Sequence, residues 1–180
     1  MTAGTRQELG RGVPYVRPQP SKGGGVVYGR ILVPLDGSAL AECVLPHVRG
    51  LIRPNQTKVF LLSVLTVSLW ERTVALMTSH PPGLRLSTMA LTRARAQLVI
   101  YLRGVAAHLR ERGALVHQEA REGNPAEEIL NCAVEFEADL IVMSGHDLSG
   151  ASRWLYGSVA DRVLRGAACP VLLVRPRPPG

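Results

Sequence analysis

The sequence has few cysteines, and its histidines are scattered. The cysteines are odd in number and widely spaced, which fits neither a disulfide framework nor a zinc motif. We expect Cys43, Cys132 and Cys169 to be small buried side chains. The histidines include no His-x-x-x-His pair and no flanking acidic cluster. The sequence therefore predicts no metal site.

Long apolar runs are also missing. No apolar stretch approaches the ~18 residues of a membrane span, because charged or polar residues interrupt each candidate strand. Residues 1–12 carry basic side chains, but no apolar segment follows them, which argues against a secretory signal. We therefore expect a cytoplasmic protein with no membrane association.

Lysine is scarce, and several catalytic motifs are missing. Only Lys22 and Lys58 are present, and there is no G-x-x-x-x-G-K-[ST] phosphate loop. The sequence also lacks a G-x-S-x-G nucleophile motif, a Cys/His pair at a loop and two carboxylates in one obvious cleft. Few residues are therefore candidates for catalysing hydrolysis, and we predict no catalytic residue.

The net charge of +7 is concentrated at the two ends of the chain. Residues 1–30 carry +4, Arg175 and Arg177 add +2, and the body is left with +1. Basic ends of this kind are commonly solvated or bind phosphate weakly, so specific nucleic-acid recognition is not expected. We predict a flexible basic Gly/Pro-rich tail over residues 1–28, a single domain over residues 29–175, and a short Arg/Pro tail over residues 176–180.

Apolar segments alternate along the chain with segments of helical periodicity. The expected strands are residues 30–35, 58–67, 115–120, 140–143 and 171–174. The expected helices are one that Ser38 caps and that reaches Ile52, a long one from about Ser87 to Arg112, one that starts at Asn124-Pro125, and one that ends at Gly166. This alternation predicts an α/β fold with a doubly wound, five-stranded parallel sheet, Rossmann-like, with strand order 3-2-1-4-5 and four helices on both faces.

Three finer features follow from the same periodicity. The first helix should bury one stripe, consisting of Leu40, Val44, Val48, Leu51 and Ile52, and Pro46 should kink it. The long helix should bury a stripe that includes Leu102, Val105 and Leu109, with Arg93, Arg95, Arg103 and Arg110 largely away from it. The connection over residues 69–86 is long, as is typical of lids, binding loops or disordered segments.

The predicted strand order also places a crevice. In doubly wound sheets the ligand lies at the carboxyl ends of the strands, where the winding reverses. That point falls between the first and fourth expected strands. Pro34-Leu35-Asp36-Gly37 should then face Ser144-Gly145-His146-Asp147.

Three ordered segments resemble the universal stress protein family. They are I-L-V-P-L-D-G-S-A-L-A-E at residues 31–42, R-E-G-N-P-A-E-E-I-L at residues 121–130, and the long segment from Asp139 to Arg175 that begins D-L-I-V-M-S-G-H. Together they span about residues 30–175. The resemblance implies an adenine-nucleotide site, with ATP or another adenine nucleotide and Mg²⁺ as its ligand.

The nucleotide-binding members of that family carry G-x2-G-x9-G-[ST] after the fourth strand. Laid on this sequence, the motif falls on Ser144, Asp147, Gly157 and Ser158, so both leading glycines are missing. Ser144-Gly145 looks like the family's Gly-Ser order reversed. A carboxylate ~4 Å from a phosphate charge costs roughly 4 kcal/mol at an effective dielectric constant near 20, or about a thousandfold in affinity. A bridging Mg²⁺ or pairing with Arg153 would offset this cost; alternatively Asp147 is a solvated turn former, or the site takes a monophosphate or a nucleoside.

The residues that the resemblance assigns to the nucleotide site come from four segments. They are Pro34, Leu35, Asp36, Val64, Met143, Ser144, Gly145, His146, Asp147, Gly157, Ser158 and Val159. Asp36 matches an aspartate near the adenosine and is also a natural turn residue before Ser38. His146 has no evident partner acid that would make it a general base.

The resemblance also implies a function and an assembly. We expect a stress-response regulatory or binding protein with weakened or lost ATP binding, which forms homodimers through the edge strand 171–174 and acts on unknown protein partners. The alternative is an ATP-binding member with slow ATP hydrolysis, and any enzymatic activity would be that of a weak ATPase. A third reading is a basic-tailed phosphate or nucleic-acid binder.

Overall fold

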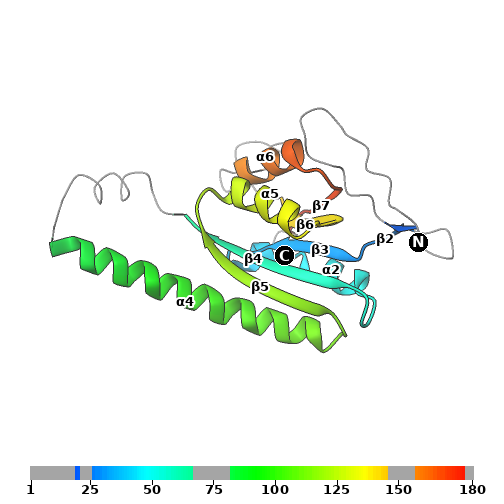
Figure 1. Ribbon diagram of the computed structural model, residues 1–180, viewed down its shortest axis with the longest axis horizontal. Coiled ribbons are helices and arrows are strands. Elements are labelled where there is room, and N and C mark those ends of the chain that lie inside the picture. The colour runs from blue at the N-terminus through cyan, green and yellow to red at the C-terminus, as the bar shows by residue number, and fades with distance from the viewer. Residues whose placement is uncertain (1–18, 21–25, 67–81, 146–156, 177–180) are drawn as a thin grey trace.

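The computed structural model describes residues 19–20, 26–66, 82–145 and 157–176. The main sheet contains β3 (Arg30–Pro34), β4 (Lys58–Leu65), β5 (Leu115–Glu122), β6 (Leu140–Ser144) and β7 (Val171–Val174). The strands lie in the order β5-β4-β3-β6-β7, and each neighbouring pair is parallel (Figure 1). Counted along the chain, these five strands have the order 3-2-1-4-5, so the predicted topology is confirmed.

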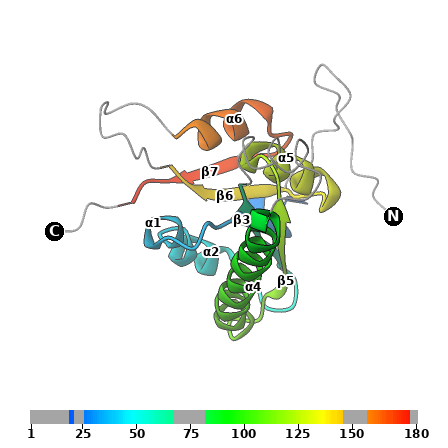
Figure 2. The same cartoon turned by 90° about the vertical axis from the view of Figure 1, so that its left-hand side faces the viewer.

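Helices cover both faces of this sheet. They are α1 (Ala39–Glu42), α2 (Leu45–Leu51), α4 (Pro82–Arg110), α5 (Pro125–Glu135) and α6 (Ser158–Gly166). The helices α1, α2 and α4 lie on one face, and α5 and α6 lie on the other (Figure 2). The doubly wound arrangement is therefore confirmed.

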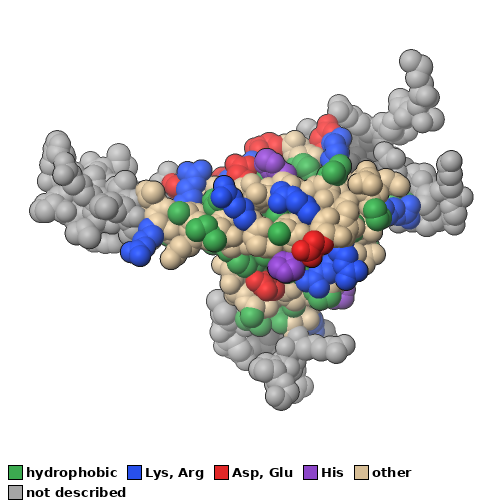
Figure 3. Space-filling view, turned by 90° about the horizontal axis from the view of Figure 1, so that it is seen from below, with side chains coloured by type: hydrophobic (Ala, Val, Ile, Leu, Met, Phe, Trp, Pro, Cys, Tyr) green, Lys and Arg blue, Asp and Glu red, His purple; other side chains and the backbone are tan. Residues whose placement is uncertain are grey.

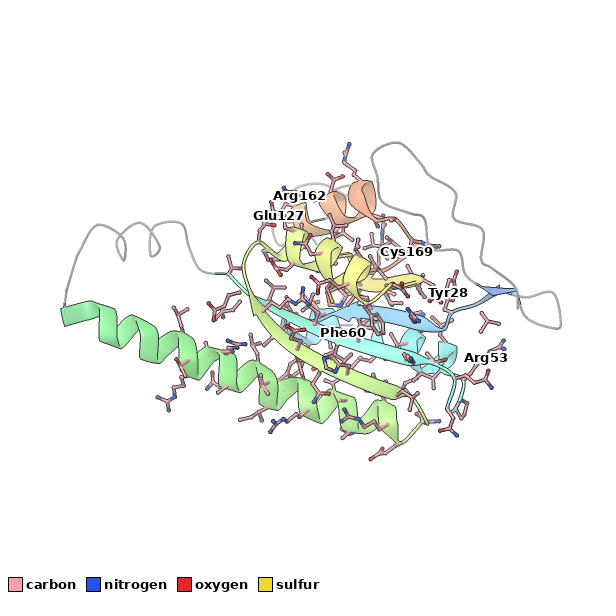
Figure 4. The ribbon with its side chains drawn as sticks, viewed as in Figure 1. Tyr28, Arg53, Phe60, Glu127, Arg162 and Cys169 are labelled. Carbon is pink, nitrogen blue, oxygen red and sulfur yellow. The ribbon has the colours of Figure 1, made fainter. Side chains whose placement is uncertain are left out.

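Alternation along the central strand divides the core into two layers. Ile31 and Val33 of β3 are fully buried in the cluster that contains the side chains of α1, α2 and α4. Leu32, between them, is fully buried in the cluster that contains those of α5 and α6. A strand with apolar residues on both faces is what a sheet covered by helices on both sides requires. Phe60 of β4 belongs to the second layer (Figure 4).

The first expected helix is divided into α1 and α2, and the prediction that Leu40 belongs to its buried stripe is wrong. Val44 and Val48 are fully buried, but Leu40 is 39% exposed. Pro46 has no N–H and its ring crowds the preceding turn, so α1 ends before it and Pro46 stands in the first turn of α2, where no backbone donor is needed. Ala41 takes the buried position on α1, while Leu51 and Ile52 are only partly buried.

The long helix α4 starts earlier than expected. It begins at Pro82 rather than near Ser87, because proline is tolerated in the first turn of a helix, where no backbone donor is needed. Residues 82–86 of the expected long connection are therefore helical, and residues 67–81 lie outside the described part of the chain. Leu102, Val105 and Leu109 are buried as predicted.

Four arginines of α4 lie outside its buried stripe, and two of them reach β5: Arg110 donates to the Val116 carbonyl oxygen at 2.7 Å, and Arg95 lies 3.9 Å from Glu122. Arg93, Arg95, Arg103 and Arg110 are all exposed. Figure 3, a view from below Figure 1, shows Lys and Arg side chains spread over that face of the molecule. Among the described helices, none has the length and apolar character that would let it cross a membrane.

Asp139 ties the start of the domain to the sheet. Its buried carboxylate accepts hydrogen bonds from the backbone N–H groups of Gly29 at 2.8 Å and Arg30 at 3.0 Å. Upstream, β1 (Gln19–Pro20) and β2 (Val26–Val27) form a short antiparallel pair within the segment expected to be a flexible tail. Most of that segment lies outside the described residues, as do residues 177–180.

Candidate functional site

The carboxyl end of β3 leads into a tightly bonded turn. The Leu35 N–H donates to the carbonyl oxygen of Leu62 at 2.8 Å, and the Leu35 carbonyl oxygen accepts from the Ser63 hydroxyl at 2.6 Å. Leu35 is almost fully buried, and Pro34 before it is half-buried. These bonds fix the backbone just before Asp36.

Asp36 is a turn residue here, as one of the two sequence interpretations proposed. Its Oδ1 accepts from the Ser38 N–H at 2.9 Å, and Gly37 has φ +84°, a conformation that glycine adopts without steric cost. Ser38 then caps α1 by accepting from the Ala41 N–H at 3.1 Å. The Asp36 side chain remains exposed, so a ligand at this edge of the sheet can reach it.

The end of β6 lies beside β3 and is shaped by β7. Met143 is buried, while Ser144 and Gly145 are half-buried. The Gly145 N–H donates to the Val174 carbonyl oxygen at 2.9 Å. Ile141 of β6 pairs with Leu32 of β3, so the two strands end at the same edge of the sheet, as the sequence predicts.

Helix α6 begins without a side-chain cap from the described part of the chain, and its N-cap is Gly157. The orphan N–H groups and the positive end of the helix dipole favour an anion at such a terminus. Ser158 is exposed and Val159 is half-buried against the α5–α6 layer. This geometry fits a phosphate-binding role for the end of the motif.

Two of the predicted site residues lie outside the described part of the chain, and a third, Val64, lies on β4 rather than on β3 or β6. His146 and Asp147 fall outside the described residues. Val64 lies near the end of β4, half-buried in the layer of α5 and α6. The structure thus brings together the ends of β3 and β6, including the altered motif position Ser144, while the placement of His146 and Asp147 stays a prediction.

The cysteines fit the structural role expected of them. Cys132 and Cys169 are buried, and Cys43 is partly buried. Burial raises the pKa of Cys132 to about 12 and that of Cys169 to about 11. Both thiols are therefore protonated at neutral pH, which removes them as nucleophiles. Within the described ranges, no three His, Cys, Asp or Glu side chains gather as a metal site would require.

Sequence reasoning missed two residues that shape this edge. Ser63 supports the Leu35 carbonyl, and Leu173 packs against Gly145. Ser63 was detectable, because a serine inside the apolar strand K-V-F-L-L-S-V-L needs a hydrogen-bond partner. Nothing in the sequence identified Leu173, because its position beside Gly145 depends on how β6 pairs with β7.

The chain matches one protein family over most of its length. A model described as "Universal stress protein family" matches residues 28–175. Universal stress protein MJ0531 of Methanocaldococcus jannaschii is 32% identical over 161 residues, which is 89% of this chain and 90% of that protein.

Solved structures agree with this match. The structure of hypothetical protein MJ0577 superposes with a TM-score of 0.71 at 26% identity, covering 86% of this chain and 100% of that one. A universal stress protein in complex with cAMP superposes with a TM-score of 0.59 at 21% identity, covering 83% and 98%. At that identity the second likeness shows a shared fold.

Proposed function

Because the chain belongs to the universal stress protein family, we propose that it is a regulatory or binding member that acts as a homodimer with weakened or lost ATP binding. The observation that carries this proposal is Asp147, which stands where the family motif has its second glycine. In the family motif this position lies beside the phosphates, so a carboxylate here would repel them.

The remaining site favours an anionic adenine ligand. The first turn of α6 has no side-chain cap within the described structure, and the turn at Asp36 is held rigidly at the same edge of the sheet. The family structure solved with cAMP supports adenine nucleotides as the ligand class to test first. We therefore propose that part of the binding surface is retained and that the weakening comes from the altered motif positions Ser144 and Asp147.

Two effects of Asp147 can be separated. One is repulsion, because a carboxylate beside a phosphate costs several kcal/mol in a medium of intermediate dielectric constant. The other is backbone freedom, because glycine reaches positive φ without cost and aspartate does so less readily. A bridging Mg²⁺ would relieve the first effect and not the second.

The test is calorimetric titration of ATP with and without Mg²⁺ into the wild-type protein and three variants. Asp147→Asn removes the charge, Asp147→Gly also restores backbone freedom, and Ser144→Gly/Asp147→Gly rebuilds the motif. We expect no saturable micromolar binding by the wild type and a gain of at least about tenfold for Asp147→Gly.

Micromolar binding by the wild-type protein would contradict the proposal. It would instead favour the ATP-binding member with slow hydrolysis, which should also release nucleotide on acid extraction. Equal affinities across all four proteins would show that Asp147 does not control the site.

The homodimer is proposed from the position of β7, which pairs with only one strand among the described residues. This strand is the last in the sheet, and Leu172 is 37% exposed on it. An uncovered apolar edge is a site for pairing with another strand. Leu172→Glu should shift the protein from dimer to monomer in light scattering, while Leu115→Glu, on the opposite edge strand β5, should not. A wild-type monomer would rule out this assembly.

A further inference from the structure

A hollow lies between α1–α2 and α4. Its volume is about 300 Å³, which is at the lower end for small-molecule sites. Polar groups come from Glu42, Arg49, Tyr101 and His108, and apolar side chains come from Leu45, Val105 and Leu109. None of the predicted nucleotide-site residues lines it. The family motif therefore does not explain this hollow.

The hydroxyl of Tyr101 is the first sign that the hollow takes a ligand. The hydroxyl oxygen is buried and has no hydrogen-bond partner of ordinary geometry in the described structure. Buried polar groups are nearly always paired, so such a group calls for a partner. Burial raises the pKa of Tyr101 above its ordinary value of 10, and so do a hydrogen-bonding interaction with the Glu42 side chain and the Glu42 charge. Glu42 therefore lies close to the hydroxyl, although the contact falls outside ordinary hydrogen-bond geometry. The phenol therefore keeps its proton beside Glu42.

The charged groups of the hollow are the second sign. Glu42 and Arg49 carry opposite charges, and within the described residues neither forms an ion pair with the other or with a third group. Opposite charges in the lining of one hollow are complementary to a molecule that carries both an ammonium and a carboxylate. Glu42 and the lone pairs of Tyr101 would accept from the ammonium, and Arg49 would donate to the carboxylate.

His108 is a further polar group in the lining of the hollow. Its Nδ1 lies 2.9 Å from the Gly104 carbonyl oxygen. A carbonyl oxygen only accepts, so Nδ1 carries the hydrogen and Nε2 is the nitrogen left for a ligand. His108 and Arg49 belong to different helices, α4 and α2. Nε2 accepts in the neutral ring and donates only in the imidazolium form, so Arg49 would hold the carboxylate, and His108 would join it only as the imidazolium.

The floor of the hollow is aliphatic. Leu45, Val105 and Leu109 are all buried, and they supply no hydrogen-bonding side chain. A ligand that fills this floor needs an aliphatic body rather than a sugar or a second charge. We propose that this hollow binds a small zwitterion with an aliphatic side chain, of the α-amino-acid class, independently of the nucleotide site.

The test uses L-leucine as the probe, with three analogues that each lack one feature. Isopentylamine lacks the carboxylate, 4-methylpentanoate lacks the ammonium, and glycine lacks the aliphatic body. Titrations are followed by calorimetry and by amide chemical shifts. We expect saturable binding of leucine with a Kd below about 1 mM and at least about tenfold weaker binding of each analogue.

Variants localise the site. Glu42→Gln and Arg49→Gln should each weaken leucine binding by about tenfold, and Tyr101→Phe should weaken it by about threefold. The matched controls Arg53→Gln and Tyr28→Phe leave the lining of the hollow intact and should bind as the wild type does. Asp147→Gly should also leave leucine binding unchanged, so this result is independent of the nucleotide titrations.

Two results would overturn the proposal. One is the lack of any heat or shift change with leucine up to about 20 mM in a protein whose spectrum shows it to be folded. The other is leucine binding that survives both Glu42→Gln and Arg49→Gln, which would place the ligand elsewhere.

Discussion

A Cβ atom on Gly145 would lie 2.7 Å from Cδ2 of Leu173, closer than real side chains approach one another. Glycine is therefore required at residue 145, directly after β6, because Leu173 of β7 packs against it. This packing accounts for the order Ser144-Gly145, in which the glycine does not stand at the motif position. A glycine restored at residue 144 still requires the one at residue 145.

Gly145→Ala should lower the free energy of unfolding by about 1–2 kcal/mol, because the new methyl group forces Leu173 to move within a packed layer. Chemical unfolding at constant m-value measures this change. Gly50→Ala, on α2, is the matched control. A Cβ added at Gly50 would have no neighbour within 4 Å, so this substitution should stabilise the protein by about 0.5–1 kcal/mol. Equal effects of the two variants would show that the Leu173 contact is easily relieved.

Asp139→Asn should destabilise the protein by about 1–3 kcal/mol, because an amide cannot accept from both backbone donors with the same geometry. Burial raises the pKa of Asp139 above its ordinary value of 3.8, although the bonds from Arg30 and Gly29 oppose the shift. The native state therefore holds this proton more tightly than the unfolded chain does. The contribution of Asp139 to stability is fully present below pH 3.8 and is lost as pH rises through the folded-state pKa.

The variant does not titrate at this position, so the stability gap between wild type and variant should widen as the pH falls from about 7 to about 4. Unfolding curves at several pH values measure the gap, with Asp161→Asn on the surface of α6 as the matched substitution. A gap that narrows on acidification would mean that the two N–H donors outweigh burial.

The overall fold could be predicted because the pattern of burial is simple. Apolar runs mark strands covered on both faces, and Asn124 with Pro125 marks a helix start that the structure confirms: Asn124 accepts from the N–H groups of Ala126 and Glu127. The break in the first helix was underestimated. Pro46 predicted a kink, but its effect on Leu40 depends on how the short α1 rotates onto the sheet, which tertiary packing decides.

The candidate site could be predicted only in part. The ends of β3 and β6 were located correctly because their neighbourhood follows from strand order. Leu35 and Gly145 have their partners on other strands, and the spacing of residues along the sequence does not identify those partners. The hollow beside Tyr101 could not be predicted for the same reason. Glu42 and His108 line it together only because α1 and α4 pack on the same face of the sheet.

Arg121→Met should cost about 1–2 kcal/mol, because Arg121 is the common partner of three carboxylates. Its guanidinium lies 2.6 Å from Glu135, 3.2 Å from Glu119 and 3.7 Å from Glu128, and the side chain is 17% exposed. The carboxylates are more exposed, so water limits the loss when the arginine is removed. Thermal unfolding at low and high salt measures the effect.

The control for Arg121 is Arg165→Met, which breaks an exposed pair with Asp161 one turn away on α6. This substitution should leave the midpoint of unfolding unchanged within error. If Arg121→Met behaved in the same way, the three-carboxylate cluster would be a set of solvated surface pairs rather than a stabilising link between β5 and α5.

Ser63→Ala should lower the free energy of unfolding by about 1–2 kcal/mol, because it leaves the buried Leu35 carbonyl oxygen without its hydroxyl donor. The loss falls at the start of the turn that carries Asp36, so amide exchange at Leu35 and Ser38 should accelerate more than exchange in β7. Ser158→Ala is the converse control: its side chain is exposed at the start of α6, so stability should change little while any anion affinity falls. If Ser63→Ala left stability and exchange unchanged, a water molecule would have replaced the hydroxyl, and the turn at Asp36 would owe its rigidity to Gly37 and Ser38 alone.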